Sequence, residues 1–344
     1  MSSATLSPRA DDARALAHRA GDAEGLGHWD SAARLYALAF RASVLDRSIA
    51  AAADALRGQA RVRNYQRRFD EAEELAQLSL AIAEANGLDQ CAARALNVLG
   101  IILLARGDWE GASRFFPLAL EMALDLGDDD LAGLACQNAG VIANAMGEFR
   151  EARTLFLESI GSFVRSGNSM HAMSAYNNLG LASTELREWM DAEVYFSRGI
   201  EIGERLSHSP TLAKLYCNRA EPLIQVGEIA RARDTLDRAQ QTAEAVGDRA
   251  TLAETLRYRG VLAVLEGHAE QAEGYLQQAL AIADDVSLTL ERARATREMG
   301  VLRARQGASA ESRRFFALAG DLFRSLGADA HVQEVQERML EVGT

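Results

Sequence analysis

The sequence predicts an all-α solenoid of helical hairpins, and three periodic features of the chain predict it. Alanine recurs every forty residues, with serine in the eighth place, at Ala32, Ala72, Ala112, Ala152, Ala192, Ala232, Ala272 and Ser312. A second small residue follows seven positions later, from Ala39 to Ala319, and a third lies twelve positions earlier, from Ala20 to Gly300. Small side chains mark places where helices touch, so this period indicates stacked helical repeats.

Each forty-residue repeat contains two apolar stretches of helical spacing broken at a short turn, for instance over 39–56 and 69–86. Beside the helix contact, an aromatic residue fills space in the first five repeats: Trp29, Phe69, Trp109, Phe149 and Trp189. The turn carries glycine in six repeats and Arg67 or Arg187 in the other two. The second stretch ends at a glycine in five repeats, as helices commonly do: Gly87, Gly127, Gly167, Gly247 and Gly327.

The two ends of the chain depart from the repeat. We expect residues 1–8 to be disordered, residues 9–327 to form eight repeats, and residues 328–344 to form a capping helix. In that last segment Val332, Val335 and Met339 recur at helical spacing with charges between them. Because each repeat packs only on its neighbours, we expect one elongated domain rather than two globular ones.

Composition narrows the class of partner. The net charge is −12, from 37 basic and 49 acidic residues, which argues against non-specific binding of nucleic acid. No apolar run approaches the roughly 18 residues that span a bilayer, and the N-terminus lacks the apolar core of a signal peptide. We therefore expect a cytoplasmic protein without membrane contact. Cys91, Cys136 and Cys217 are widely spaced, as is typical of reduced thiols.

Reactive groups that could converge on a substrate are scarce. The six histidines form no His-x-x-x-His pair, and no cysteine lies at ligand spacing. Lys214 follows no glycine-rich turn, and no Gly-x-Ser-x-Gly elbow occurs. Acidic pairs such as Glu73 and Glu74 are typical of a solvated helix surface. The sequence therefore predicts no enzyme, no metal and no cofactor.

The repeats resemble tetratricopeptide repeats, most clearly in repeats three to five. The third repeat matches the Leu-Gly, Gly-x-aromatic-x-x-Ala, Phe and Ala pattern at Leu99-Gly100, Gly107 to Ala112, Phe116 and Ala119. The next two repeat the match around Gly140 and Gly180. Forty-residue units of this kind are similar to those of bacterial regulators and kinesin light chains. The resemblance implies a right-handed superhelix of about eight hairpins.

Helical geometry predicts where a binding surface lies. In the first helix of each repeat, six positions fall within about 120° of one another at about 100° per residue. In tetratricopeptide proteins this face lines the concave groove. Here its flanks hold Asn97, Gln137, Asn138, Asn177, Asn178 and Asn218, and its centre holds Ile101, Val141 and Leu181. Carboxamides could bond the backbone of an extended peptide, and the aliphatic groups could receive its side chains. Alternatively, the carboxamides bond each other or cap a helix, and the aliphatic stripe is core.

Charged residues add two further features to this face. Glu221 stands at the centre of the predicted groove in repeat six, and Pro222 follows it, where proline should kink or end the helix. Function and drift both explain this departure. Arg57 and Arg61 in the early repeats, and Arg257 in the late ones, would suit an acidic partner or a terminal carboxylate. Alternatively, the arginines of this face pair with nearby acids, among them Asp54, Glu254 and Glu298.

These features together predict a non-catalytic adaptor that binds a protein or an extended peptide in the groove. A ligand- or peptide-responsive bacterial sensor that acts through a separate output protein is the first alternative, because no output domain is visible in the sequence. An enzyme of unknown type is the second alternative.

Overall fold

A computed structural model describes residues 10–342, and these residues form seventeen α-helices. The chain falls into two compact units, Met1–Ala175 and Tyr176–Thr344, which we call the N-terminal and C-terminal units. The expected disorder of residues 1–8 lies outside the described residues.

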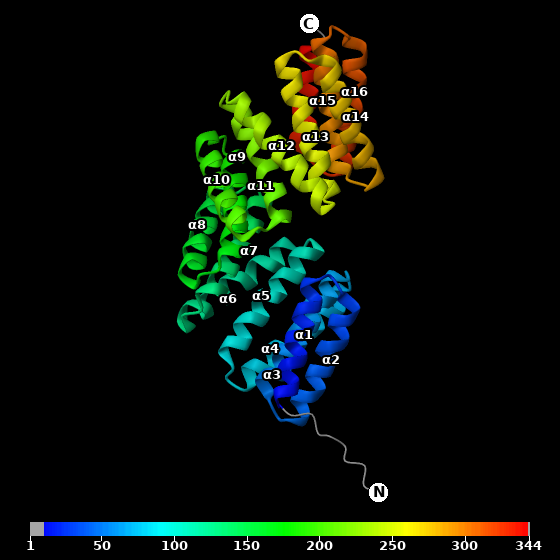
Figure 1. Cartoon of the computed structure of the whole chain (residues 1–344). Helices are drawn as coiled ribbons and strands as arrows, with labels where there is room; N and C mark the ends of the chain where they lie inside the picture. The colour runs from blue at the N-terminus through cyan, green and yellow to red at the C-terminus, as the bar shows by residue number, and fades with distance from the viewer. Residues whose placement is uncertain (1–9, 343–344) are drawn as a thin grey trace. The chain divides into compact units, whose positions relative to one another are not determined.

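The N-terminal unit contains four complete helical hairpins (Figure 1). Its helices are α1 (Ala10–Gly25), α2 (Trp29–Leu45), α3 (Ile49–Tyr65), α4 (Phe69–Ala85), α5 (Asp89–Arg106), α6 (Trp109–Leu126), α7 (Asp129–Ala145) and α8 (Phe149–Ser166).

The boundary between the units falls within α9 (Ser169–Glu185). The helices that follow are α10 (Trp189–Leu206), α11 (Ser209–Gln225), α12 (Ile229–Val246), α13 (Arg249–Glu266), α14 (Ala269–Asp285), α15 (Thr289–Arg305), α16 (Ser309–Ser325) and α17 (Asp329–Glu341). The last of these packs against α16.

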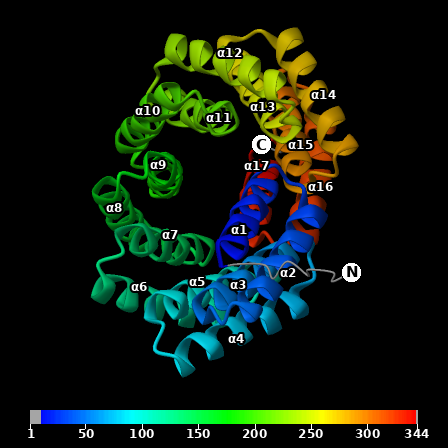
Figure 2. The ribbon, with the colours of Figure 1, turned by 60° about the horizontal axis from the view of Figure 1, so that its bottom comes forward.

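From α1 to α8 and from α10 to α17, each helix packs against the next one along the chain (Figures 1 and 2). The odd-numbered helices up to α15 are the first helices of the repeats, and the even-numbered ones are the second helices. First helices also pack on one another, α3 with α5 and α5 with α7 in the N-terminal unit, and α11 with α13 and α13 with α15 in the C-terminal unit. The chain is therefore an α-solenoid of hairpins in register with the forty-residue period.

The small residues of the period lie at the helix contacts, as predicted. Ala32, Ala72 and their counterparts through Ser312 are fully buried. Where the first helix carries glycine, an aromatic ring from the second helix often occupies the space that a side chain would take. A Cβ added at Gly140 would lie 2.7 Å from the ring of Phe156, and one at Gly180 would lie 2.5 Å from the ring of Phe196. Complementary sizes at these two positions fix how closely the two helices of a hairpin approach.

The turns share one backbone conformation whether or not they contain glycine. Gly107 and Gly147 have φ of 90° and 81°, and Arg67 and Arg187 adopt φ of 59° and 58° in the equivalent turns. Arg47, Ser207 and Ser287 are likewise left-handed at the ends of second helices. The stretch 39–56, which we expected to be one helix, is instead the end of α2 and the start of α3, because Arg47 makes this turn without a glycine.

Pro222 does not end its helix. Helix α11 continues past it to Gln225, and the backbone N–H of Val226 donates to the carbonyl of Pro222 at 3.0 Å. Across residues 10–342, no helix is long and apolar enough to cross a membrane.

Candidate functional site

The predicted site residues all lie on first helices, and their carboxamides form two pairs between neighbouring helices. In the N-terminal unit, the side-chain amide of Asn138 on α7 donates to the side-chain oxygen of Asn97 on α5 at 3.1 Å. In the C-terminal unit, Asn218 on α11 donates in the same way to Asn177 on α9 at 2.9 Å. Asn97, Asn177 and Asn218 are only 6%, 9% and 7% exposed. These pairs therefore join successive repeats, one of the alternatives that the sequence left open.

Two carboxamides of the same face have no such partner. The side-chain oxygen of Gln137 is buried without a hydrogen bond to any described residue. Asn178 is partly exposed, and among the described residues its side chain forms no hydrogen bond. A carboxamide offers two N–H donors and an acceptor oxygen. These two residues thus keep hydrogen-bonding capacity that the fold does not use.

The aliphatic residues of the face are half-buried. Ile101 packs against the core formed by Leu103, Phe116 and their neighbours, and Val141 and Leu181 are also intermediate in exposure. Ile101 therefore contacts the core with one side and presents apolar surface with the other.

Arg57 and Arg61 lie one turn apart on α3, but their guanidinium groups have different numbers of hydrogen-bond acceptors. Arg61 donates two hydrogen bonds to Glu24 on α1, both 2.8 Å, and one to the hydroxyl of Tyr36. Arg57 pairs only with Asp54 at 2.8 Å, and its Nε is buried without an acceptor. Burial and the neighbouring Arg61 lower the pKa of Arg57, whereas the bonds to Glu24 overcome burial and raise the pKa of Arg61. Arg57 is therefore a partly buried cation that has fewer acceptors than Arg61 among the described residues.

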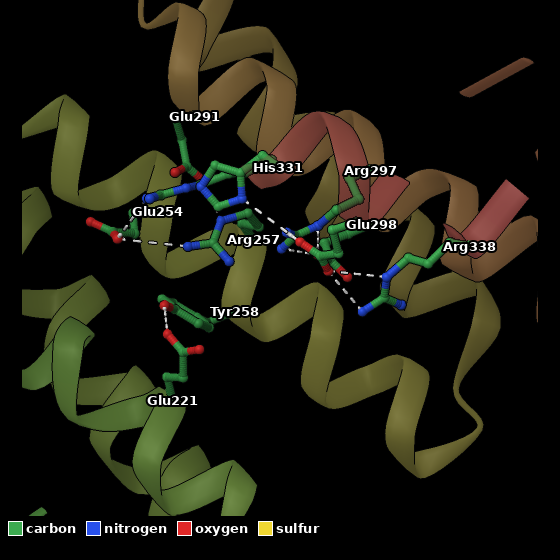
Figure 3. Close-up of polar contacts among 11 residues, drawn as sticks. Glu221, Glu254, Arg257, Tyr258, Glu291, Arg297, Glu298, His331 and Arg338 are labelled. Carbon is green, nitrogen blue, oxygen red and sulfur yellow. Dashed lines mark hydrogen bonds and ion pairs between the residues drawn. The ribbon is translucent and has the colours of Figure 1, made fainter. Parts of the chain in front are cut away.

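Arg257 is instead fully enclosed by acceptors (Figure 3). It is 4% exposed, contacts Glu291 on α15 at 2.6 Å and Glu254 at 3.6 Å, and lies 4.0 Å from the ring centre of Tyr258. Burial disfavours its charge, but Glu291, Tyr258 and Glu254 together raise the pKa of Arg257 well above its ordinary value. This arginine is a structural link between α13 and α15.

Glu221 also has an internal partner. The hydroxyl of Tyr258 on α13 donates to Glu221 on α11 at 2.6 Å (Figure 3). Burial raises the pKa of Tyr258 well above its ordinary value, which keeps the hydroxyl protonated and able to donate. The carboxylate that breaks the pattern of repeat six therefore connects neighbouring first helices.

A second set of ion pairs connects α15 to α17. Arg297 on α15 and Arg338 on α17 both contact Glu334 of α17, at 2.7 Å and 3.0 Å. A hydrogen bond from His331 and the two guanidinium groups lower the pKa of Glu334 to about 2. Sequence reasoning did not select Tyr258, Glu291 or Glu334. The sequence signal that could have identified them is their position: Tyr258 and Glu291 lie on first helices, and Glu334 lies on the helix that follows the last repeat.

Metal chemistry finds no support in this part of the chain. Within residues 10–342, no three side chains of His, Cys, Asp or Glu lie close enough to hold an ion. Cys136 and Cys217 are buried, and burial raises the pKa of both thiols, that of Cys136 to about 11.

Residues 51–125 match the family model for the tetratricopeptide repeat. A search of curated protein sequences finds no match. The family match therefore rests on part of the chain, over repeats two and three.

Solved structures resemble the chain over most of its length. A signal-transduction ATPase with a tetratricopeptide repeat sensor from Pyrococcus horikoshii has a TM-score of 0.71 at 12% identity, over 95% of this chain and 50% of that one. The quorum sensor NprR from B. thuringiensis has a TM-score of 0.61 at 11% identity, over 97% of this chain and 99% of NprR. The apo form of RapI has a TM-score of 0.59 at 14% identity, over 80% of this chain and 98% of RapI. This chain thus spans half the length of the ATPase and nearly all of NprR and RapI.

Proposed function

We propose that this chain, which carries tetratricopeptide repeats and has their fold, has a non-catalytic function: it binds an extended peptide segment of a protein partner across the first helices α3, α5 and α7 of its N-terminal unit. The observation that carries this proposal is the unused hydrogen-bonding capacity of Gln137 on that face. Unsatisfied polar groups are costly when buried, so such groups beside apolar surface suit a partner that completes them.

The spacing of the face suits an extended chain. Arg57, Asn97 and Gln137 occupy the same register on α3, α5 and α7, which pack side by side. Packed helices lie about 8–10 Å apart, and an extended strand advances about 3.3 Å per residue. Roughly three peptide residues would therefore span each repeat. Ile101 and Val141, one turn further along α5 and α7, provide apolar surface for side chains of the peptide.

Charge favours an acidic residue at one end of this segment. Arg57 has one partly exposed acidic partner, and its buried Nε has no acceptor. A carboxylate of the peptide would accept the hydrogen bond that this Nε can donate. Arg257 would not serve in this way, because Glu291 and Glu254 already surround it. The proposal therefore assigns acid recognition to the N-terminal unit and not to Arg257.

Selection from a random peptide library tests this function. We expect the selected peptides to be enriched in acidic residues and to bind the variant Gln137→Ala about tenfold or more weakly. Gln277→Ala, which removes a carboxamide from the second helix α14, is the matched control and should leave binding unchanged. Equal affinity of all three proteins for every selected peptide would remove the first-helix surface from the proposal.

A sensor is the second candidate, and the near-complete coverage of the quorum sensor NprR favours it. In that case a free short peptide occupies the same surface and alters binding to a separate output protein. Pull-downs with the Gln137→Ala variant separate the two candidates. Capture of a partner protein that this variant weakens supports the adaptor, and capture that the variant leaves unchanged but that a selected free peptide alters supports the sensor.

A further inference from the structure

An apolar pocket of about 440 Å³ lies in the N-terminal unit, away from the first-helix surface described above. Its walls come from α6, α7 and α8 and include Phe116, Pro117, Ile142 and Leu155. Two carboxylates, Glu148 and Glu151 in the turn before α8 and its first turn, also line it. The volume lies within the range typical of small-molecule sites.

The pocket exists because repeat four has lost a large side chain. Ala139 on α7 occupies a register position that holds Arg19, Gln59, Leu99, Leu179, Arg219, Arg259 and Met299 in the other repeats. Leu99 is 2% exposed and packs against Ala72 and Ala76 of the preceding second helix. Only in repeat four is this position occupied by alanine, and the space remains open.

In repeats six and seven, the side chain that fills this space is an arginine. Arg219 on α11 contacts Glu193 on α10, and Arg259 on α13 contacts Asp237 on α12 and the hydroxyl of Tyr275 on α14. The counterparts of these three partners in the pocket are Ser113, Pro117 and Leu155. A guanidinium on an aliphatic stem is therefore a natural occupant of the equivalent space.

Glu151 lacks the cationic partner that its counterparts in repeats two and eight have. In repeat two, Arg63 contacts Glu71 at 3.3 Å, and in repeat eight Arg303 contacts Glu311 at 3.1 Å. Both glutamates occupy the register of Glu151, and both arginines occupy that of Ala143. Within residues 10–342, neither Glu151 nor Glu148 pairs with a cation. Two alanines of α7 thus leave an apolar space with unpaired acids beside it.

We propose that this pocket binds a small organic cation, an ammonium or guanidinium group on an apolar body. The apolar body fills the space that Ala139 leaves, and the cation meets Glu151 and Glu148. Neither Gln137 nor Val141 of the peptide surface lines this pocket, so the two sites are separate.

Phenylbutylammonium is a suitable probe, and neutral phenylbutanol is its matched control. We expect saturable one-to-one binding of the ammonium by calorimetry, with the alcohol about fivefold or more weaker. Glu151→Gln should reduce ammonium affinity by about the same factor. Glu110→Gln removes an equal charge from α6 at a carboxylate that does not line the pocket and already pairs with Arg114, so it should change nothing.

Two variants close the pocket by the means that other repeats use. Ala139→Leu copies Leu99, and Ala143→Arg copies the arginines that pair with Glu71 and Glu311. Each should abolish ammonium binding while the thermal midpoint stays equal or rises, which separates loss of the site from loss of the fold. Absence of saturable ammonium binding, equal affinity for the alcohol, or unchanged binding in a folded Ala139→Leu protein would each overturn the proposal.

Discussion

The buried carboxamide pair of the C-terminal unit allows the stability contribution of a paired asparagine to be compared with that of an unpaired one. Replacing Asn218 by alanine leaves Asn177, 9% exposed, without the hydrogen bond of 2.9 Å that now satisfies it. A buried polar group left unpaired costs about 1–3 kcal/mol. Asn178→Ala is the matched control, because that side chain forms no hydrogen bond among the described residues. Both changes gain the same helix propensity, about 0.5–0.7 kcal/mol, so it cancels in the comparison.

Urea unfolding followed by circular dichroism measures the difference. We expect Asn218→Ala to be less stable than Asn178→Ala by about 1–3 kcal/mol. Adding Asn177→Ala to Asn218→Ala should cost little more, or restore stability, because the unpaired group is then removed. If the two single variants unfold within about 0.5 kcal/mol of each other, the pair does not support the fold and the reasoning is refuted.

Three further predictions concern the scaffold. Ser287→Gly should raise stability by about 0.5–1 kcal/mol in urea unfolding, because Ser287 has a left-handed φ of 58°; a loss of stability would contradict this. Gly140→Ala should lower the free energy of unfolding by about 1–3 kcal/mol, because its Cβ would lie 2.7 Å from the ring of Phe156. A Cβ at Gly274 on α14 would meet nothing within 4 Å, so Gly274→Ala should stabilise the fold. The reverse order of stabilities would refute the packing argument. Glu334 has its pKa lowered to about 2, so its ionised form should stabilise the fold above the ordinary value of 4.5, and this contribution should be lost as pH falls toward 2. Thermal midpoints of wild type and Glu334→Gln should therefore converge over that interval, and a constant difference would contradict the assignment.

Much of the fold follows from the sequence because one contact recurs in every repeat. Small residues at fixed spacing predicted which backbone positions are buried, and these positions are buried. The boundary between α2 and α3 did not follow, because Arg47 takes a left-handed conformation that sequence patterns associate with glycine. Nor does α11 end at Pro222, one of the two outcomes expected there.

The site was less predictable, because pairing between helices depends on geometry that a one-dimensional register does not contain. Asn97 and Asn138 are forty-one residues apart, one more than the repeat, and meet only because α5 and α7 pack with the required offset. Likewise, the sequence allowed Arg257 to be a groove residue or a member of a structural ion pair. Its contact with Glu291 in the structure identifies the ion pair. The pocket beside Ala139 could have been found by comparing its register position across the repeats.

Side-chain amide resonances of the intact protein test the central claim most directly. On addition of a selected acidic peptide, we predict that the side-chain amide signal of Gln137 shifts with the bound fraction while that of Gln277 on α14 stays in place. Shifts confined to Gln277 and other second-helix side chains would contradict binding at the first-helix surface.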